Sequence, residues 1–164
     1  MNKAIFAGTF DPFTIGHYEL VKRACELFDE VIVAVSVATN KKCVADCNQR
    51  LEIAKESVAD LKNVSAVLFD GFLTDFAKEN GCKYIIRGLR NSIDFEYEKN
   101  LYAQYKAICS DIEVFYLICD AKIEFISSSF IKEVVKLGGD YTPYLCENAK
   151  RLVTEVYESA LVKN

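Results

Sequence analysis

The sequence is short of several residue types, and each shortage excludes a class of protein. Its 164 residues include one histidine, two prolines and no tryptophan. It has no proline- and glycine-rich linker, internal repeat or low-complexity tract, so we expect a single domain over residues 1–164. The 24 acidic residues outnumber the 20 lysines and arginines, and the net charge of −4 argues against a protein that binds nucleic acid without regard to sequence.

Long hydrophobic runs are missing as well. No run approaches the length of a membrane span, and the first residues lack the basic and apolar regions of a secretory signal. We therefore expect a cytoplasmic protein that does not bind membranes. Apolar residues make up 51% of the chain, which is enough for one well-filled hydrophobic core.

Cysteines are plentiful, but their spacing does not match a metal site or a disulfide framework. The seven cysteines are scattered, and no CxxC pair occurs. Cys43 and Cys47 could form half of a zinc site, but no second pair follows at short spacing and the only histidine, His17, is far away in sequence. We expect reduced, mostly buried thiols and no metal bound by the protein itself.

Short apolar runs alternate with amphipathic helical patterns along the chain. The runs are rich in valine, isoleucine, phenylalanine and tyrosine, as in strands buried on both faces, and they cover residues 3–7, 31–37, 64–69, 83–86 and 113–119. The helical patterns cover residues 17–28, 48–61, 72–80, 93–109, 128–137 and about 146–162. This alternation predicts an α/β fold, a Rossmann-like doubly wound five-stranded parallel sheet with helices on both faces and extra C-terminal helices.

The first expected strand ends in a turn that favours an anion. Residues 8–17 (GTFDPFTIGH) join this strand to the first helix. A helix that starts directly after a glycine turn presents backbone N–H groups without intrahelical partners, and its dipole adds positive charge. A tight connection alone would not require Thr9, Thr14 and His17. An imidazole at this place can donate to a phosphoryl oxygen that gains charge during transfer.

Other strand ends also carry groups that suit phosphates. Lys41 and Lys42 follow the second run, Arg87 and Arg90 follow the fourth, and the segment ISSS at residues 126–129 follows the fifth. The carboxyl ends of parallel strands share one edge of a sheet, so these groups are expected to meet there. Together they would collect several phosphates in a protein that is acidic overall.

These groups have structural alternatives. A pair of lysines such as Lys41 and Lys42 often lies in a solvated loop without binding a ligand. The three serines could cap the following helix, although capping and phosphate binding are compatible. Arg87 directly follows a buried strand, which favours a ligand or a carboxylate partner. Asp94 and Glu98 lie on one helix face and repel each other unless a cation such as Arg90 or Mg²⁺ intervenes. The tyrosine-rich pattern over residues 97–108 indicates packing in the core or between subunits.

Taken together, the motifs resemble those of the phosphopantetheine adenylyltransferase family over nearly the whole chain. TxGH alone marks only the wider nucleotidyltransferase superfamily, whereas the order and spacing of the other segments narrow it to one family. The segments are GTFDP and TIGH within residues 8–17, Lys41-Lys42, RGLR at 87–90, DFEYE at 94–98 and FISSS at 125–129. The resemblance implies adenylyl transfer from ATP to 4′-phosphopantetheine with Mg²⁺ as cofactor, giving dephospho-coenzyme A and pyrophosphate in coenzyme A biosynthesis.

The resemblance also implies roles for individual residues. His17 and Lys41 would be catalytic, stabilising direct attack at the α-phosphorus without a covalent enzyme intermediate. ATP would be bound by Thr9, Phe10, His17, Gly88, Leu89, Arg90, Glu98, Ile123, Glu124, Phe125, Ile126, Ser127, Ser128 and Ser129. The phosphopantetheine would be bound by Thr9, Lys41, Leu73 and Arg87. Mg²⁺ would be held mainly by the ATP phosphates, the protein would be a homo-oligomer of the hexameric kind, and coenzyme A is a candidate feedback ligand.

Two other interpretations stay open. A sister enzyme, such as a cytidylyltransferase or a nicotinamide-mononucleotide adenylyltransferase, would use His17 on a different acceptor, and RGLR together with Lys41 argues against it. The chain could also be a catalytically silent nucleotide-binding sensor. Such a sensor could lose His17, whereas the chain has His17 together with the other site residues Thr9, Lys41, Arg87 and Arg90.

Overall fold

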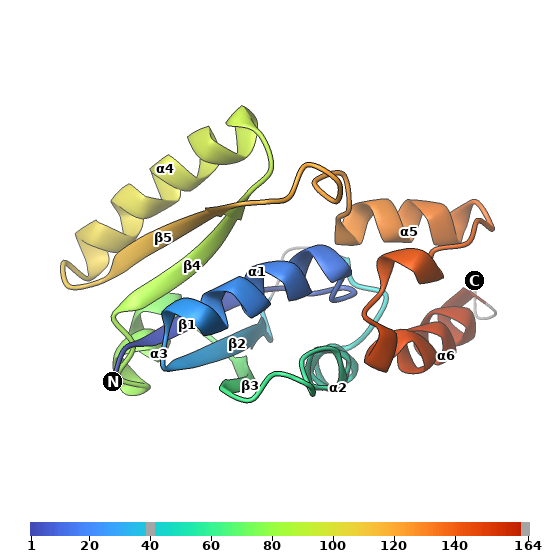
Figure 1. The fold of residues 1–164 in the computed structure, drawn as a ribbon, viewed down its shortest axis with the longest axis horizontal. Coiled ribbons are helices and arrows are strands. Elements are labelled where there is room, and N and C mark those ends of the chain that lie inside the picture. Colours follow the sequence, from blue (N-terminus) through green and yellow to red (C-terminus); the bar gives the residue numbers. More distant parts are fainter. Residues whose placement is uncertain (39–41, 162–164) are drawn as a thin grey trace.

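A five-stranded parallel sheet forms the centre of the protein (Figure 1). The structure is a computed structural model that describes residues 1–38 and 42–161. The strands follow one another across the sheet in the order β3-β2-β1-β4-β5, and every pairing is parallel. Their bounds are β1 Lys3–Gly8, β2 Glu30–Ser36, β3 Val64–Phe69, β4 Tyr84–Leu89 and β5 Glu113–Ile118. The predicted Rossmann-like fold is confirmed.

Within the described ranges, six α-helices accompany the sheet. They are α1 Ile15–Leu27, α2 Cys47–Ser57, α3 Leu73–Glu79, α4 Ser92–Ile108, α5 Ser128–Lys136 and α6 Lys150–Leu161. Two short 3-10 helices, η1 (Thr142–Tyr144) and η2 (Glu147–Ala149), lie between α5 and α6. Figure 1 shows α5 and α6 near each other at one end of the molecule. None of the helices described is long and apolar enough to cross a bilayer.

The side chains of each central strand alternate between two hydrophobic cores. In β1, Ala4 and Phe6 belong to a core that also contains buried residues of α1, α2, α5 and α6. Ile5 and Ala7 belong to the second core, where α3 and the C-terminal part of α4 pack. Because successive strand residues point to opposite faces, both faces of the sheet are covered, and this explains the nearly continuous apolar runs.

β4 runs further than its apolar run predicted. β1 pairs with β4 only as far as Phe6 and Ile86, but β5 continues to pair with Arg87, Gly88 and Leu89. Backbone hydrogen bonding to β5 therefore extends β4 beyond its apolar residues, and these three residues belong to the strand rather than to the loop after it. From Arg87 onward, β1 and β4 are no longer paired, which leaves a crevice at the centre of the sheet edge.

The C-terminal region also differs from the expected pattern in detail. The single helix expected from about residue 146 is divided into η2 and α6. α5 ends close to its predicted end, where Gly138 adopts a φ of 71° that glycine tolerates best. The cysteines are also mostly inside: Cys82, Cys109 and Cys146 are buried and the other four are partly buried.

Candidate active site

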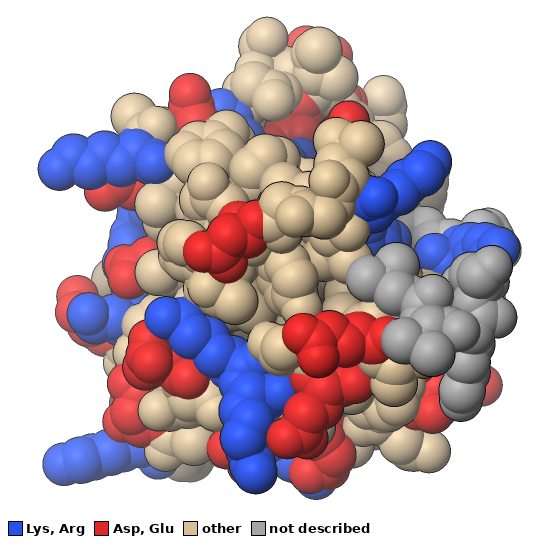
Figure 2. All heavy atoms as spheres, turned by 90° about the vertical axis from the view of Figure 1, so that its right-hand side faces the viewer, with Lys and Arg blue, Asp and Glu red and all other residues tan. Residues whose placement is uncertain are grey.

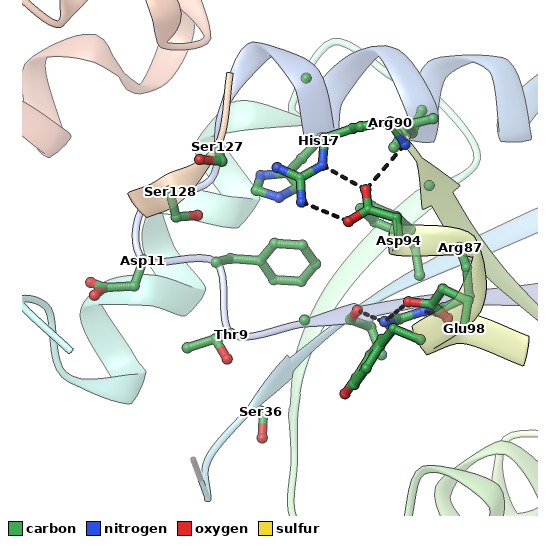
Figure 3. Close-up of a pocket in the computed structure, with 18 of the residues that line it drawn as sticks. Thr9, Asp11, His17, Ser36, Arg87, Arg90, Asp94, Glu98, Ser127 and Ser128 are labelled. Atoms are coloured by element: carbon green, nitrogen blue, oxygen red, sulfur yellow. Dashed lines mark hydrogen bonds and ion pairs between the residues drawn. The ribbon is translucent and has the colours of Figure 1, made fainter. Parts of the chain in front are cut away.

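A cavity of about 900 Å³ occupies the crevice at the carboxyl ends of the strands. Its wall is built by the turn after β1, the first turn of α1, the ends of β2 and β3, the last residues of β4, one side of α4, and the segment that leads into α5. Figure 3 shows residues from these segments turned toward one space. The cavity therefore lies where ligands of open α/β sheets usually bind, next to the point where strand order reverses.

The structure brings most of the predicted site residues to this cavity. Those that line it are Thr9, Phe10, His17, Leu73, Arg87, Gly88, Arg90, Glu98, Ile123, Ile126, Ser127, Ser128 and Ser129. Three others do not line it: Leu89 pairs with Ile118 of β5, Glu124 is exposed, and Phe125 packs its ring against Phe130 and Tyr144. Lys41 lies outside the described residues, so its role stays a prediction from the sequence.

His17 is held by a reciprocal capping box at the start of α1. Thr14 is the N-cap residue: its side chain accepts the His17 N–H at 3.4 Å, and its own N–H donates to Nδ1 of His17 at 3.0 Å. Two N–H groups at the helix start are satisfied in this way. Because Nδ1 is an acceptor, a neutral His17 carries its proton on Nε2, which makes the other edge of the ring a hydrogen-bond donor.

The surroundings of His17 keep the imidazole neutral. The rings of Phe6, Phe10 and Phe13 lie 6.2, 5.1 and 5.2 Å from its ring, measured between centroids. Loss of hydration, followed by the nearby positive charge of Arg90, lowers the pKa of His17 to about 4. At neutral pH the side chain is therefore a neutral donor, oriented before any ligand arrives.

The position of Arg87 favoured a ligand or a carboxylate partner, and the structure shows a carboxylate partner. Its Nε and Nη2 donate to the two carboxylate oxygens of Glu98 at 2.8 and 2.5 Å, and Nη1 donates to the carbonyl of Ala7 at 3.2 Å. Burial disfavours the charged guanidinium, but the hydrogen bonds and charge of Glu98 outweigh it and raise the pKa of Arg87. The bidentate pair keeps the guanidinium protonated and fixes its orientation in the wall of the cavity.

Arg90 forms a second, separate pair. Its Nε and Nη2 donate to Asp94 at 2.9 and 3.2 Å, and its backbone N–H donates to the same carboxylate at 3.1 Å. The expected repulsion between Asp94 and Glu98 is thus relieved by two arginines, one for each carboxylate, rather than by one shared cation (Figure 3). Both pairs lie in the wall of the cavity, and the Arg90 pair is the more exposed of the two.

The serines after β5 have different partners. Ser127 caps α5 by accepting the N–H of Phe130 at 3.0 Å, so the capping alternative is confirmed for this serine. Ser128 donates to the carbonyl of Pro12 at 2.8 Å and so ties the start of α5 to the turn after β1. Both α1 and α5 therefore begin at the cavity, and two helix N-termini directed at one space favour a bound anion.

Asp11 is a buried residue whose role the sequence did not reveal. Its carboxylate accepts the N–H groups of Val44 and Ala45 at 2.9 and 3.0 Å, the hydroxyl of Tyr157 at 3.0 Å, and Nζ of Lys132 at 3.2 Å. Loss of hydration and the charge of Asp11 raise the pKa of Tyr157. Asp11 thus joins the turn after β1 to the segment before α2, to α5 and to α6. Near Asp11 the sequence shows only an acidic residue within FDPF, which does not indicate these partners.

Two cationic residues of this region also escaped the sequence-based prediction. Lys132, four residues after Ser128 on α5, lines the cavity. Arg50 of α2 is buried, and its Nη1 donates to the carbonyls of Thr9 and Ser36 at 2.6 and 2.9 Å. The spacing of Lys132 from the serines could have indicated its place, whereas nothing near Arg50 in the sequence indicates burial.

Part of the cavity wall carries apolar and aromatic side chains. Phe72 and Leu73 at the start of α3 line it together with Tyr97, Leu101 and Tyr105 of α4. α3 and α4 belong to the core on the opposite face of the sheet from α1 and α5. The cavity therefore joins a polar region that suits phosphates to a region that suits an apolar chain or ring.

The outer surface beyond the cavity carries charges of both signs. On the side of the molecule where α5 and α6 lie, basic and acidic side chains are intermixed around apolar and neutral ones (Figure 2). The described side chains on this face mix both charges, so the groups suited to a phosphate are those that line the cavity.

Comparison with known proteins matches both the fold and the motifs. Residues 5–134 match the model of a cytidylyltransferase-like family. Among similar curated proteins is the phosphopantetheine adenylyltransferase of Flavobacterium psychrophilum, 42% identical over 142 residues, which are 87% of this chain and 93% of the relative. Those of Nautilia profundicola and Shouchella clausii are 43% and 38% identical, over 84% and 96% of this chain and 90% and 99% of the relatives.

Solved structures with lower sequence identity share the fold. A bifunctional NMN adenylyltransferase/ADP ribose pyrophosphatase from Francisella tularensis superposes with a TM-score of 0.73 at 15% identity, over 99% of this chain and 53% of that one. A Vibrio parahaemolyticus protein assigned as a nicotinate-nucleotide adenylyltransferase gives a TM-score of 0.66 at 21% identity, over 93% and 99% of the two chains. These two likenesses establish the fold and leave the acceptor to be argued from the site.

Proposed function

The chain belongs to the phosphopantetheine adenylyltransferase family of nucleotidyltransferases, and from this membership we propose that it transfers the adenylyl group of ATP to 4′-phosphopantetheine in coenzyme A biosynthesis. The observation that carries the proposal is the cavity itself, where a neutral donor on His17, two helix N-termini and two arginines surround one space. An apolar region next to these phosphate-binding groups suits the pantetheine arm.

The chemistry needs positioning and charge stabilisation more than proton transfer. A phosphate oxygen of 4′-phosphopantetheine attacks the α-phosphorus of ATP, a new P–O bond forms, and the bond to pyrophosphate breaks, which yields dephospho-coenzyme A. The attacking group is already an anion, so no strong general base is required. We assign charge stabilisation at the α-phosphorus to His17 through Nε2–H and, from the sequence, to Lys41, with no covalent enzyme intermediate.

The two arginine pairs suggest how the substrates share the site. Glu98 uses both carboxylate oxygens to orient Arg87, so we infer that Glu98 positions this guanidinium in addition to its predicted contact with ATP. Arg87 would then meet the acceptor, with Thr9, Leu73 and Lys41. The remaining ATP-binding residues proposed from the sequence, including Leu89, Glu124 and Phe125 outside the cavity wall, stay predictions.

Mg²⁺ is proposed as the cofactor that accompanies ATP. The described part of the chain contains no group of three or more histidine, cysteine, aspartate or glutamate side chains placed to hold a metal. Its oxygen ligands would be mainly ATP phosphates and water, and it would offset the charge of the leaving pyrophosphate. Chelation of Mg²⁺ is expected to abolish turnover and leave the folded state unchanged by circular dichroism.

Self-association is part of the same proposal. Apolar side chains are exposed on α4 and β5, among them Ile93, Ile108, Phe115 and Ile118. Such a surface suits packing between copies of the chain, and we infer a homo-oligomer, a hexamer by family membership. Sedimentation velocity would give the assembly mass, and a monomer at micromolar concentration would contradict the inference. A cytoplasmic location remains a prediction from the hydrophobic pattern of the sequence, and feedback by coenzyme A remains a prediction from the resemblance.

Pyrophosphate release tests the acceptor directly. The purified protein is incubated with ATP and Mg²⁺, with and without 4′-phosphopantetheine, beside a His17→Ala variant. Release that requires the acceptor and collapses in the variant is the expected result. If ATP binds but no pyrophosphate appears, the phosphate site is real and the acceptor is wrong, and nicotinamide mononucleotide is the next acceptor to screen.

A further inference from the structure

Arg50 places a buried positive charge directly behind the wall of the cavity. The residue lies on α2, only 2% exposed, and is absent from the cavity lining. Its Nη1 donates to the carbonyl of Thr9, just after β1, and to the carbonyl of Ser36, the last residue of β2. Thr9 and Ser36 both line the cavity. One guanidinium therefore holds two neighbouring strand ends at the place where the ligand is bound.

This charge has no acidic partner in the part of the chain that the structure describes. The ion pairs of those residues leave Arg50 out, and its Nε, although buried, has no hydrogen-bond partner. Arg87 and Arg90, in contrast, each have a carboxylate. A guanidinium stays protonated at any physiological pH, and burying it without a counter-ion disfavours the folded state. Fold stability alone therefore does not explain a charged residue at this position.

An anion in the cavity would supply the missing counter-charge. Carbonyl oxygens carry partial negative charge, so the ends of β1 and β2 would repel a phosphate unless a cation offsets them. Figure 3 shows Thr9 and Ser36 on one side of the space, away from Ser127, Ser128 and Arg90. Ser127, Ser128 and Arg90, which we assign to ATP, lie on the other side, whereas Thr9 is also assigned to the acceptor. In the proposed arrangement, the anion nearest Arg50 is therefore the phosphate of the acceptor.

We propose that Arg50 is a positioning residue for the phosphate of 4′-phosphopantetheine, acting through the backbone of Thr9 and Ser36 and through its buried charge. The inference rests on the proposed function, because it takes the acceptor from there. Arg50 does not touch the substrate in this arrangement. It sets how strongly the site prefers a phosphorylated acceptor over an unphosphorylated one.

The test compares two ligands that differ only in this phosphate. Affinities for pantetheine and 4′-phosphopantetheine are measured by calorimetry on the wild type, Arg50→Gln and Arg50→Lys. Glutamine can still donate to a carbonyl but has no charge, and lysine keeps the charge. The matched control is Arg23→Gln, because Arg23 is exposed and donates to the carbonyl of Ile118 at 2.7 Å, outside the cavity.

Arg50→Gln is expected to reduce the preference for the phosphorylated ligand about tenfold, the size expected for one charge acting over several ångströms of protein. The affinity for pantetheine should stay within about twofold, and Arg50→Lys should keep most of the preference. Steady-state kinetics should show a raised KM for the acceptor and an unchanged KM for ATP. Because both ligands are measured on the same variant, a loss of folded protein lowers both signals and cancels from the ratio.

Two results would overturn the inference for different reasons. If the wild type prefers the phosphorylated ligand and Arg50→Gln keeps the full preference, Arg50 is only a structural tie between two strands. If the wild type does not distinguish the ligands at all, the proposed acceptor is wrong, and the role of Arg50 falls with it.

Discussion

Replacing His17 by alanine removes two interactions that can be measured separately. Nδ1 of His17 accepts the N–H of Thr14 and completes the capping box of α1, while the proton on Nε2 is left for the substrate. Loss of a helix cap costs about 1 kcal/mol of folding free energy. Loss of one preorganised donor at a developing oxyanion costs about 10²–10³ in kcat, or about 3–4 kcal/mol. The catalytic effect is therefore expected to exceed the effect on stability.

His17→Gln separates the two effects. Glutamine is the usual partner of threonine in a capping box, so its side-chain oxygen can accept the N–H of Thr14 and restore stability. That hydrogen bond holds the side chain back against the helix start, so kcat should stay low. Urea unfolding reports stability, pyrophosphate release reports kcat, and calorimetry reports ATP affinity, which should fall by less than about tenfold in both variants.

Two outcomes would refute this reasoning. Equal losses of kcat and of ATP affinity in His17→Ala would mean that His17 binds the ground state as strongly as the transition state. Recovery of kcat together with stability in His17→Gln would mean that the capping box alone accounts for the effect of the alanine.

Three more tests concern the pH dependence of stability, the buried carboxylate of Asp11, and Gly88. The pKa of His17 is about 4 in the folded protein, below its ordinary 6.5, so between these pH values the unfolded chain binds a proton that the folded protein does not. The free energy of unfolding should therefore fall by about 3 kcal/mol as the pH drops from 6.5 to 4. Urea unfolding of wild type and His17→Gln measures the contribution of His17, and the same pH dependence in both proteins would contradict it. Asp11→Asn leaves the ammonium of Lys132 without its counter-ion and weakens three other hydrogen bonds, so it should lower the free energy of unfolding by about 3 kcal/mol; an unchanged urea midpoint would contradict the role given to Asp11. Gly88→Ala would place a Cβ 2.4 Å from Cδ1 of Leu20, so it should destabilise the protein by about 1–3 kcal/mol in thermal unfolding, and a double-mutant cycle with Leu20→Ala should show that the two changes are not additive.

The secondary structure could be predicted because its signals are local. A strand buried on both faces needs a continuous apolar run, and the runs at residues 31–37 and 64–69 lie within one residue of β2 and β3. Where the boundary depended on a neighbouring strand, the prediction was short. The residues Arg87, Gly88 and Leu89 are in β4 because β5 continues beside them, and no apolar pattern records that pairing.

The residues that could bind a phosphate were also recognisable individually in the sequence, but their hydrogen-bond and ion-pair partners were not. Asp94 and Glu98 were expected to share a cation, because helix spacing places them on one face. The structure gives each its own arginine, since Arg87 in β4 reaches the second turn of α4 whereas Arg90 in the loop reaches the first. His17 was recognised as a donor, but its tautomer depends on the hydrogen bond from Thr14.

Local sequence patterns were enough to predict the α/β class, the glycine turn before α1, and a set of cationic and hydroxyl residues at successive strand ends. Each is encoded within a few neighbouring residues by apolar periodicity or turn chemistry. Which buried charges are balanced depends instead on contacts between distant parts of the chain. Asp11 accepts from Ala45, Lys132 and Tyr157, which are 34, 121 and 146 residues away, and Arg50 reaches Thr9 from 41 residues away. Such partners are chosen by how helices pack on the sheet and how far water is excluded, and both depend on the whole chain at once.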